Sequence, residues 1–311
     1  MSLPTPSPAI GITPYTDESL VGFIFRLAKR VGYGTAGGML ALANARRIPT
    51  NRPELSLLEV YSALSKVPVA DLEALGWGPP DRKRGIFRGR ILQNAMFRGT
   101  ATYSTRTICP HCLSEAAYYR AWWDIVPITA CPIHNVYLIN SCGRCGDDLR
   151  WTGRDIAACK CGAVLQDLQT RPLSVTEIGG SATIQGLLGD SRFEAQAVAV
   201  RCQPHLSDMT DGEIVEFLWR LGLELIGPRP KIFSVEHPGN LVLDAHIALK
   251  EALGAIHRWP DGFSEAADIM IERWGRLRTI SAFRRWRDTL QQGHGQAIVD
   301  TITKKLEINA L

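Results

Sequence analysis

The sequence predicts a mostly α-helical protein with tandem zinc-ribbon modules in its middle. Apolar residues recur at three- and four-residue intervals near both ends of the chain, which is the spacing of amphipathic helices. Between residues 107 and 165 this periodicity gives way to a segment that holds seven of the eight cysteines. Cysteines grouped in this way are typical of small modules that a metal ion holds together.

The N-terminal part is expected to form a bundle of short helices. Its first predicted helix covers residues 17–31, with Asp17 as the N-cap and an apolar stripe that includes Phe23. Further helices are predicted over residues 35–46, 56–66 and 69–75. Short helices joined by tight turns are typical of helix-turn-helix-like folds.

A basic connector follows these helices. Residues 82–106 contain seven basic side chains and no acidic one. We identify five of them as candidate contacts with nucleic acid or a protein partner: Arg82, Lys83, Arg84, Arg88 and Arg90. A solvated face without a partner is the alternative, because arginine stems also cover apolar surface.

Helical periodicity returns after the cysteines. Thr210 and Glu213 have the spacing of a capping box ahead of an apolar stripe. Later helices are predicted over residues 240–257, 264–274, 281–291 and 296–307. We therefore expect three domains. The first (1–106) is helical and helix-turn-helix-like and includes the basic connector, and the second (107–170) is the tandem zinc-ribbon segment. The third (171–311) is again helical and helix-turn-helix-like.

The cysteine segment contains two complete sets of four metal ligands. The first set is Cys109, Cys112, Cys131 and His134, and the second is Cys142, Cys145, Cys159 and Cys161. Zinc prefers a closed tetrahedron of thiolate and imidazole ligands, and a two-residue gap lets one tight turn aim both side chains at the same ion. We therefore predict two structural Zn²⁺ ions per chain. Buried free thiols or a redox pair are the alternative.

Neighbouring residues are not expected to extend these sites. His111 lies between two ligands and is interpreted as a solvated side chain. Cys202 and His205 have the C-x2-H spacing but lack a second pair, so a partly buried thiol is favoured over a third metal site. The glycines at positions 143, 146 and 162 directly follow ligands and are expected to adopt positive φ angles.

A second basic stretch lies near the C-terminus. Its candidate nucleic-acid or partner contacts are Arg273, Arg276, Arg278, Arg284, Arg285 and Arg287, with no acidic residue among them. If a helix from Ser281 is the second helix of a helix-turn-helix, some of these guanidinium groups could reach phosphates while Phe283 and Trp286 pack inward. A solvated helix face is again the alternative.

The composition excludes several classes of protein. With 45% hydrophobic and 21% charged residues, the chain is neither disordered nor collagen-like. No stretch approaches the ~18 apolar residues of a spanning helix. The first sixteen residues lack the basic cluster and apolar run of a secretory signal, so we expect a cytoplasmic protein. The net charge of +4 permits an anionic partner.

The motifs of common enzymes are also missing from the sequence. We find no Walker phosphate loop, G-x-S-x-G, H-E-x-x-H or G-x-G-x-x-G. Zinc sites with four protein ligands leave no open position for water or substrate. We therefore do not expect an enzyme.

Residues along positions 15–165 resemble the TniQ/TnsD family. The resemblance is carried by Asp17-Glu18-Ser19-Leu20, Arg26-Leu27-Ala28, Cys109-Pro110-His111-Cys112-Leu113, Arg120, Trp122, Cys131-Pro132-Ile133-His134, Leu138, Cys142, Cys145, Leu149-Arg150-Trp151 and Cys159-x-Cys161-Gly162. Beyond them only a helical, basic character agrees. Proteins of this family select target sites for transposons related to the Tn-seven group, including CRISPR-associated transposons.

The resemblance implies a non-enzymatic adaptor in DNA transposition. Such an adaptor links target DNA, or an RNA-guided Cascade-type complex, to an AAA+ ATPase transposition regulator. The compact C-terminal part departs from the long, site-specific members of the family, which argues against autonomous reading of a DNA sequence. A stand-alone zinc-containing DNA-binding transcriptional regulator is the alternative, and self-association as a homodimer stays open.

Overall fold

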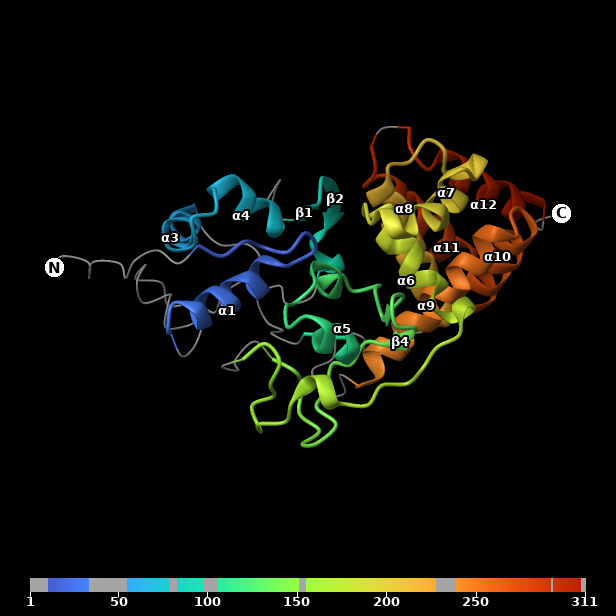
Figure 1. Cartoon of the computed structure of the whole chain (residues 1–311). Coiled ribbons are helices and arrows are strands. Elements are labelled where there is room, and N and C mark those ends of the chain that lie inside the picture. The colour runs from blue at the N-terminus through green and yellow to red at the C-terminus, as the bar shows by residue number, and fades with distance from the viewer. Residues whose placement is uncertain are drawn as a thin grey trace. The chain divides into compact units, whose positions relative to one another are not determined.

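The structure, a computed structural model, describes residues 11–33, 55–78, 83–97, 106–150, 155–227, 239–291 and 293–308. The fold is mostly helical, with small two-stranded sheets in the N-terminal half (Figure 1). The chain divides into two units, Met1–Leu173 and Ser174–Leu311. Our division into three domains stays a prediction.

Helix α1 (Leu20–Arg30) begins at Ser19 and not at Asp17. The Ser19 hydroxyl accepts a hydrogen bond from the backbone N–H of Gly22 at 3.1 Å and so caps the helix. The prediction of Asp17 as the N-cap is therefore wrong, and this carboxylate accepts the Tyr118 hydroxyl instead. The apolar stripe is buried as predicted, with Phe23 fully covered.

Two further helices belong to this part of the chain. Helix α3 (Leu55–Ser65) and helix α4 (Val69–Leu75) are joined by a three-residue turn, the length found in helix-turn-helix motifs. Lys66 enters this turn with φ = 65°. Both helices were predicted from the sequence, whereas the helix predicted over residues 35–46 lies outside the described residues.

The basic connector contains a β-hairpin that the sequence analysis missed. Strands β1 (Arg84–Phe87) and β2 (Arg90–Gln93) pair antiparallel, and a short 3-10 helix (Asn94–Met96) follows. Arg88 and Gly89 form the two-residue turn, both with positive φ, as the right-handed twist of a hairpin favours. Apolar residues on both sides of Arg88-Gly89 were the available signal.

The zinc segment has little regular structure. It contains helix α5 (Pro110–Glu115), 3-10 turns at Ala121–Asp124 and Leu165–Asp167, and strands β3 (Ala130–Cys131) and β4 (Val136–Tyr137). Trp122 and Trp123 are buried here and serve as core residues. Trp122 packs edge-on against Phe87 of the hairpin. The hairpin and the cysteine segment therefore share one apolar core.

The second unit is built from seven described helices (Figure 1). They are α6 (Val175–Leu187), α7 (Glu194–Arg201), α8 (Asp211–Ile226), α9 (Gly239–His257), α10 (Asp261–Trp274), α11 (Arg276–Arg287) and α12 (Gln296–Ile308), with 3-10 turns at Ser191–Phe193 and Pro204–Leu206. The capping box of Thr210 and Glu213 is confirmed. A second capping box, Ser174 with Glu177, begins α6, which was not predicted.

Helix α11 differs from its predicted course. It begins at Arg276, directly after Gly275, and ends at Arg287, whereas the sequence predicted residues 281–291. Gly275 has φ = 80°, a conformation that ends α10 and turns the chain within one residue. The junction is therefore shorter than the three- to four-residue turn of a helix-turn-helix.

Helix α8 lies against α9 at the centre of this unit. A Cβ atom at position 222 would lie 2.2 Å from the carbonyl oxygen of Ala248, so only glycine permits this approach of the two backbones. Glu213 accepts a hydrogen bond from the backbone N–H of Gln291 and contacts His294 Nδ1, each at 2.8 Å. Glu213 of the α8 capping box thereby also binds the segment between α11 and α12.

No helix in the part of the chain that the structure describes is long and apolar enough to cross a membrane.

Candidate metal centres and basic surface

The first predicted ligand set comes together around one point. Cys109 and Cys112 stand at the start of α5, Cys131 ends β3, and His134 lies in the turn before β4. The His134 Nδ1 atom is 3.3 to 3.6 Å from the three sulfurs, and Cys112 Sγ is 3.6 Å from Cys131 Sγ. Asn135 has φ = 54°, which closes the turn behind His134.

These separations fit a zinc ion. A tetrahedral ion with Zn–S bonds of ~2.3 Å holds its sulfurs ~3.8 Å apart, and sulfur-to-nitrogen separations are slightly shorter. The observed distances agree with this geometry to within a few tenths of an ångström. The donor set of three soft thiolates and one imidazole is also one that zinc prefers.

Glu115 adds an outer partner to this cluster. Its carboxylate oxygen Oε1 lies 2.9 Å from His134 Nε2, on the side of the ring that faces away from the sulfurs. A carboxylate in this position fixes the Nε2–H tautomer and leaves the Nδ1 lone pair for a metal. Sequence reasoning missed Glu115, although its place three residues after Cys112 on one short helix is a usable signal.

The crowded thiols of the first cluster do not all ionise by themselves. Hydrogen bonds from Cys109 and Cys112 lower the pKa of Cys131 to about 2. Hydrogen bonds to Cys109 and Cys131 raise the pKa of Cys112 far above its ordinary value. One thiolate therefore suppresses the ionisation of its neighbour, and a divalent cation is the partner that allows all three sulfurs to be thiolates.

The second ligand set is also assembled. Cys142 Sγ lies 3.8 Å from Cys161 Sγ, and Cys145 Sγ lies 3.8 Å from Cys159 Sγ, again the separation across a zinc tetrahedron. The four sulfurs all lie within 4.8 Å of one another. Cys142 and Cys159 are buried, whereas Cys145 and Cys161 are exposed.

Two of the three predicted glycine turns are present. Gly146 and Gly162 have φ angles of 74° and 82° and close the two knuckles of the second cluster. Gly143 does not have positive φ, so that part of the prediction is wrong. The turn after Cys142 is instead closed by hydrogen bonds between the backbones of Cys142 and Asp147 and of Gly146 and Cys142.

Arg106 is buried beside the second cluster and does not belong to a basic surface. Its side chain donates hydrogen bonds to the carbonyl oxygens of Ile156 at 2.7 Å and Ala158 at 3.3 Å, directly before Cys159. Its backbone N–H donates to Leu149, which follows the first knuckle. Arg106 therefore connects the chain segments on both sides of the cluster, with a positive charge close to the thiols.

The remaining candidate ligands stay outside the clusters. His111 stacks loosely near His134, with ring centroids 5.5 Å apart. Cys202 is exposed, whereas His205 is buried against Trp259 with ring centroids 3.6 Å apart. Burial lowers the pKa of His205 to about 4, so this ring stays neutral. Among the described residues, only the two predicted clusters gather enough ligands for a metal ion.

The first cluster is joined to helix α1 by the polar residues that carry the family resemblance. Backbone hydrogen bonds run from Ser19 N–H to Tyr119 O at 2.9 Å and from Ala121 N–H to Asp17 O at 2.8 Å. Arg120 lies 3.5 Å from the Asp17 carboxylate and donates to the carbonyl oxygen of Cys112 at 3.4 Å. A ligand of the metal site is thereby linked to the start of α1.

A buried ion pair completes this junction. Arg26 donates to both carboxylate oxygens of Glu18, at 2.6 and 2.7 Å. Burial raises the pKa of the Glu18 carboxyl, and the Arg26 guanidinium opposes that shift. A Cβ at position 22 would lie 2.8 Å from the Tyr119 Cβ, so glycine is needed where α1 crosses this segment.

The predicted C-terminal arginines divide into two groups. Arg273 binds the carbonyl oxygens of Glu224 and Leu225 at the end of α8, and Arg287 contacts Asp288 and Gln296. The exposed arginines on α11 are Arg276, Arg278, Arg284 and Arg285, and Leu277 is 83% exposed among them. Phe283 and Trp286 are buried on the other side of α11, as predicted.

Two of these arginines have no competing carboxylate. Within the described residues, neither Arg284 nor Arg285 forms an ion pair, whereas Arg278 lies over the Trp274 ring with its guanidinium carbon 4.4 Å from the centroid. We call the exposed arginines of α11, positions 276, 278, 284 and 285, the α11 basic face. The role of this face in nucleic-acid binding stays a prediction.

The arginines of the basic connector are partly engaged in the fold. Arg88 packs over the Trp122 ring at 5.0 Å and donates to the carbonyl oxygen of Thr16 at 3.0 Å. Arg90 donates to the carbonyl oxygen of Arg88. Lys83 and Arg84 lie at the start of the hairpin, and Arg82 is outside the described residues. The hairpin thereby uses at least two of these cations to hold its own turn and its contact with the core.

The fold and the two ligand sets define a helical protein with zinc-ribbon-like cysteine clusters. Residues 9–138 match the family model described as TniQ, which confirms the family resemblance over that part of the chain. The match indicates a protein associated with transposition. A search among curated proteins found no match.

Metal content tests both clusters together. We expect two zinc ions per chain by native mass spectrometry, and one ion after either Cys112→Ser or Cys145→Ser, because each change removes a ligand from a different tetrahedron. Cys202→Ser is the matched control, since Cys202 lies outside both clusters, and should keep two ions. A folded wild-type protein without metal would contradict the assignment.

The contact between Glu115 and His134 should tune only the first site. In a Cys145→Ser background, Glu115→Gln should weaken zinc binding by about 10-fold to 100-fold, because the imidazole loses its orienting carboxylate. Competition with a chromophoric chelator measures this change. Glu59→Gln, an exposed position on α3, should leave the affinity unchanged. Equal affinities for Glu115→Gln and the parent protein would show that the carboxylate has no influence on the metal.

Proposed function

We propose that this protein is a non-enzymatic target-selection adaptor in DNA transposition. It would link target DNA, or an RNA-guided Cascade-type complex, to an AAA+ ATPase transposition regulator, and it would act in the cytoplasm, where its target lies. The observation that carries the proposal is the TniQ match over residues 9–138. This match covers helix α1 and the complete first metal cluster.

The arrangement of the first unit supports an adaptor. Zinc binding would fix the cysteine segment, since apparent binding free energies of ~10–16 kcal/mol in finger peptides exceed the stability of an ordinary domain. The link from Cys112 through Arg120 to Asp17 then holds α1 against that segment. A cysteine segment and a helix α1 that are fixed to each other present their surfaces in one orientation, which suits a protein that must contact two partners at once.

The α11 basic face supports a contact with nucleic acid. Arg284 and Arg285 are exposed on a helix whose opposite side is anchored by Phe283 and Trp286. Arginine suits phosphate because its planar guanidinium can donate two hydrogen bonds to one group. This geometry serves either a DNA target or the RNA of a guide complex.

The adaptor proposal is tested by capture of its regulator. We expect the zinc-loaded full chain to retain a purified AAA+ transposition regulator in a pull-down at fixed salt. Cys112→Ser should lose this interaction, because the cysteine segment is then no longer held in a fixed position against α1. Cys202→Ser is the control and should retain the regulator. Failure to bind the regulator, together with tight binding to one DNA sequence, would favour the stand-alone transcriptional regulator.

The contact with nucleic acid is tested by its dependence on salt. Each phosphate neutralised on duplex DNA contributes about −0.9 to the slope of log K against log salt concentration. Arg285→Ala should therefore reduce the magnitude of the slope by about one, as measured by fluorescence anisotropy. Arg192→Ala is the control, because Arg192 pairs with Asp190 at 2.7 Å, and should leave the slope unchanged. An unaltered slope in Arg285→Ala would remove this residue from the interface.

A further inference from the structure

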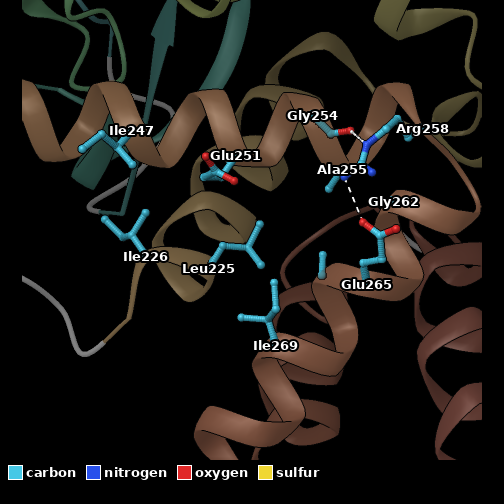
Figure 2. A pocket seen from close by; sticks show the side chains of 11 residues that line it. Leu225, Ile226, Ile247, Glu251, Gly254, Ala255, Arg258, Gly262, Glu265 and Ile269 are labelled. Atoms are coloured by element: carbon cyan, nitrogen blue, oxygen red, sulfur yellow. Dashed lines mark hydrogen bonds and ion pairs between the residues drawn. The ribbon is translucent and has the colours of Figure 1, made fainter.

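A groove with an apolar floor lies within the second unit (Figure 2). Its volume is about 570 Å³, within the range of ligand sites, and it is formed by the end of α8, by α9 from Ile247 onward and by α10 from Gly262 to Ile269. Leu225 and Ile226 lie between the two walls, with Ile247 on α9 and Ile269 on α10. The groove shares no lining residue with the metal clusters or with the α11 basic face.

The walls leave apolar surface open to solvent. Ile247 is 41% exposed and Ile269 is 43% exposed, although each belongs to a helix whose other side is packed in the core. Two large apolar side chains that line the same groove at this exposure cost free energy in water, at roughly 25 cal/mol per Å². Exposed apolar side chains that gather at one place, unlike ones scattered singly, point to a surface that a partner covers.

The charges around the groove are unbalanced. Arg258 is already engaged, because it pairs with Glu265 at 3.0 Å and donates to the carbonyl oxygen of Gly254 at 3.4 Å, as Figure 2 shows. Glu251 lies between Ile247 and Gly254 along α9, and no cation pairs with it in the described part of the chain. The groove therefore offers a carboxylate with apolar surface on both sides.

Gly254 leaves the α9 wall of the groove without a side chain at that position. A Cβ atom at position 254 would meet no atom within 4 Å, so this glycine is not required by packing inside the protein. Its absent side chain leaves the α9 backbone accessible beside Glu251. Gly262 differs, since a Cβ there would lie 2.7 Å from the Arg258 Cβ and would push α10 away from α9.

We propose that this groove binds an amphipathic helix of a partner protein that carries a lysine or arginine between two apolar residues. The apolar residues of the partner would cover Ile247 and Ile269, and its cation would pair with Glu251. Helices bind grooves in this way through apolar anchors three or four residues apart. The charge pair would fix the direction of the bound helix, because apolar contacts alone do not.

Peptide selection on the zinc-loaded full chain tests the proposal. A random peptide library displayed on phage is panned against the wild-type protein and depleted on Gly254→Leu, which adds a bulky side chain at a groove position where a Cβ meets no atom within 4 Å. We expect enrichment of peptides with two apolar residues that flank a lysine or arginine. A synthetic peptide of the enriched sequence should bind Gly254→Leu and Glu251→Lys at least tenfold more weakly than wild type.

Charge exchange and matched controls separate the groove from non-specific attraction. Replacing the peptide's basic residue with glutamate should restore binding to Glu251→Lys. Gly179→Leu is the control for Gly254→Leu, because a Cβ at Gly179 also meets no atom within 4 Å, and Glu272→Lys is the control for the change of charge. Both control proteins should bind the original peptide as wild type does.

Three results would overturn the proposal. One is the absence of any peptide that distinguishes wild type from Gly254→Leu. Another is enrichment of peptides without a basic residue, which would remove the role of Glu251. The third is a wild-type dimer in sedimentation velocity that Gly254→Leu dissociates, because a second copy of this chain would then be the occupant.

Discussion

Closure of the cysteine clusters is the constraint on which the first unit depends. Where the structure describes the segment between Arg106 and Leu173, it contains two short strands, one six-residue helix and 3-10 turns, so regular secondary structure alone cannot specify its path. Sulfur and nitrogen atoms held 3.3 to 3.8 Å apart specify it instead. Because neighbouring thiolates repel one another, a bound divalent cation would stabilise this arrangement.

The metal clusters acquire a wider role through the polar residues around them. Arg120 binds both the Cys112 carbonyl oxygen of the first cluster and the Asp17 carboxylate before α1. Arg106 connects the segments on both sides of the second cluster. Both guanidinium groups are buried and bind carbonyl oxygens, which a lysine could not contact in the same fork geometry. The family resemblance over this region therefore coincides with residues that hold helix and clusters together.

The second unit contributes surfaces of a different chemistry. The α11 basic face presents guanidinium groups on a helix with a buried aromatic side, which suits a phosphate backbone. The groove between α8, α9 and α10 combines exposed isoleucines with Glu251, which has no cationic partner among the described residues, and this combination suits a basic helix. In the proposed adaptor, these two surfaces would serve partners of different chemistry, a phosphate backbone and a basic helix.

The sequence by itself determined the helical fold class, the two clusters of four candidate metal ligands and the capping box of Thr210 and Glu213, because these depend on spacing along the chain. Tertiary structure alone decided the rest. It paired the Asp17 carboxylate with Tyr118 and left Ser19 to cap α1, paired Glu115 with His134, buried Arg106 and opened the groove beside Glu251. Each of these depends on contacts between segments distant in sequence or on the space left between packed helices, and neither has a periodic signature.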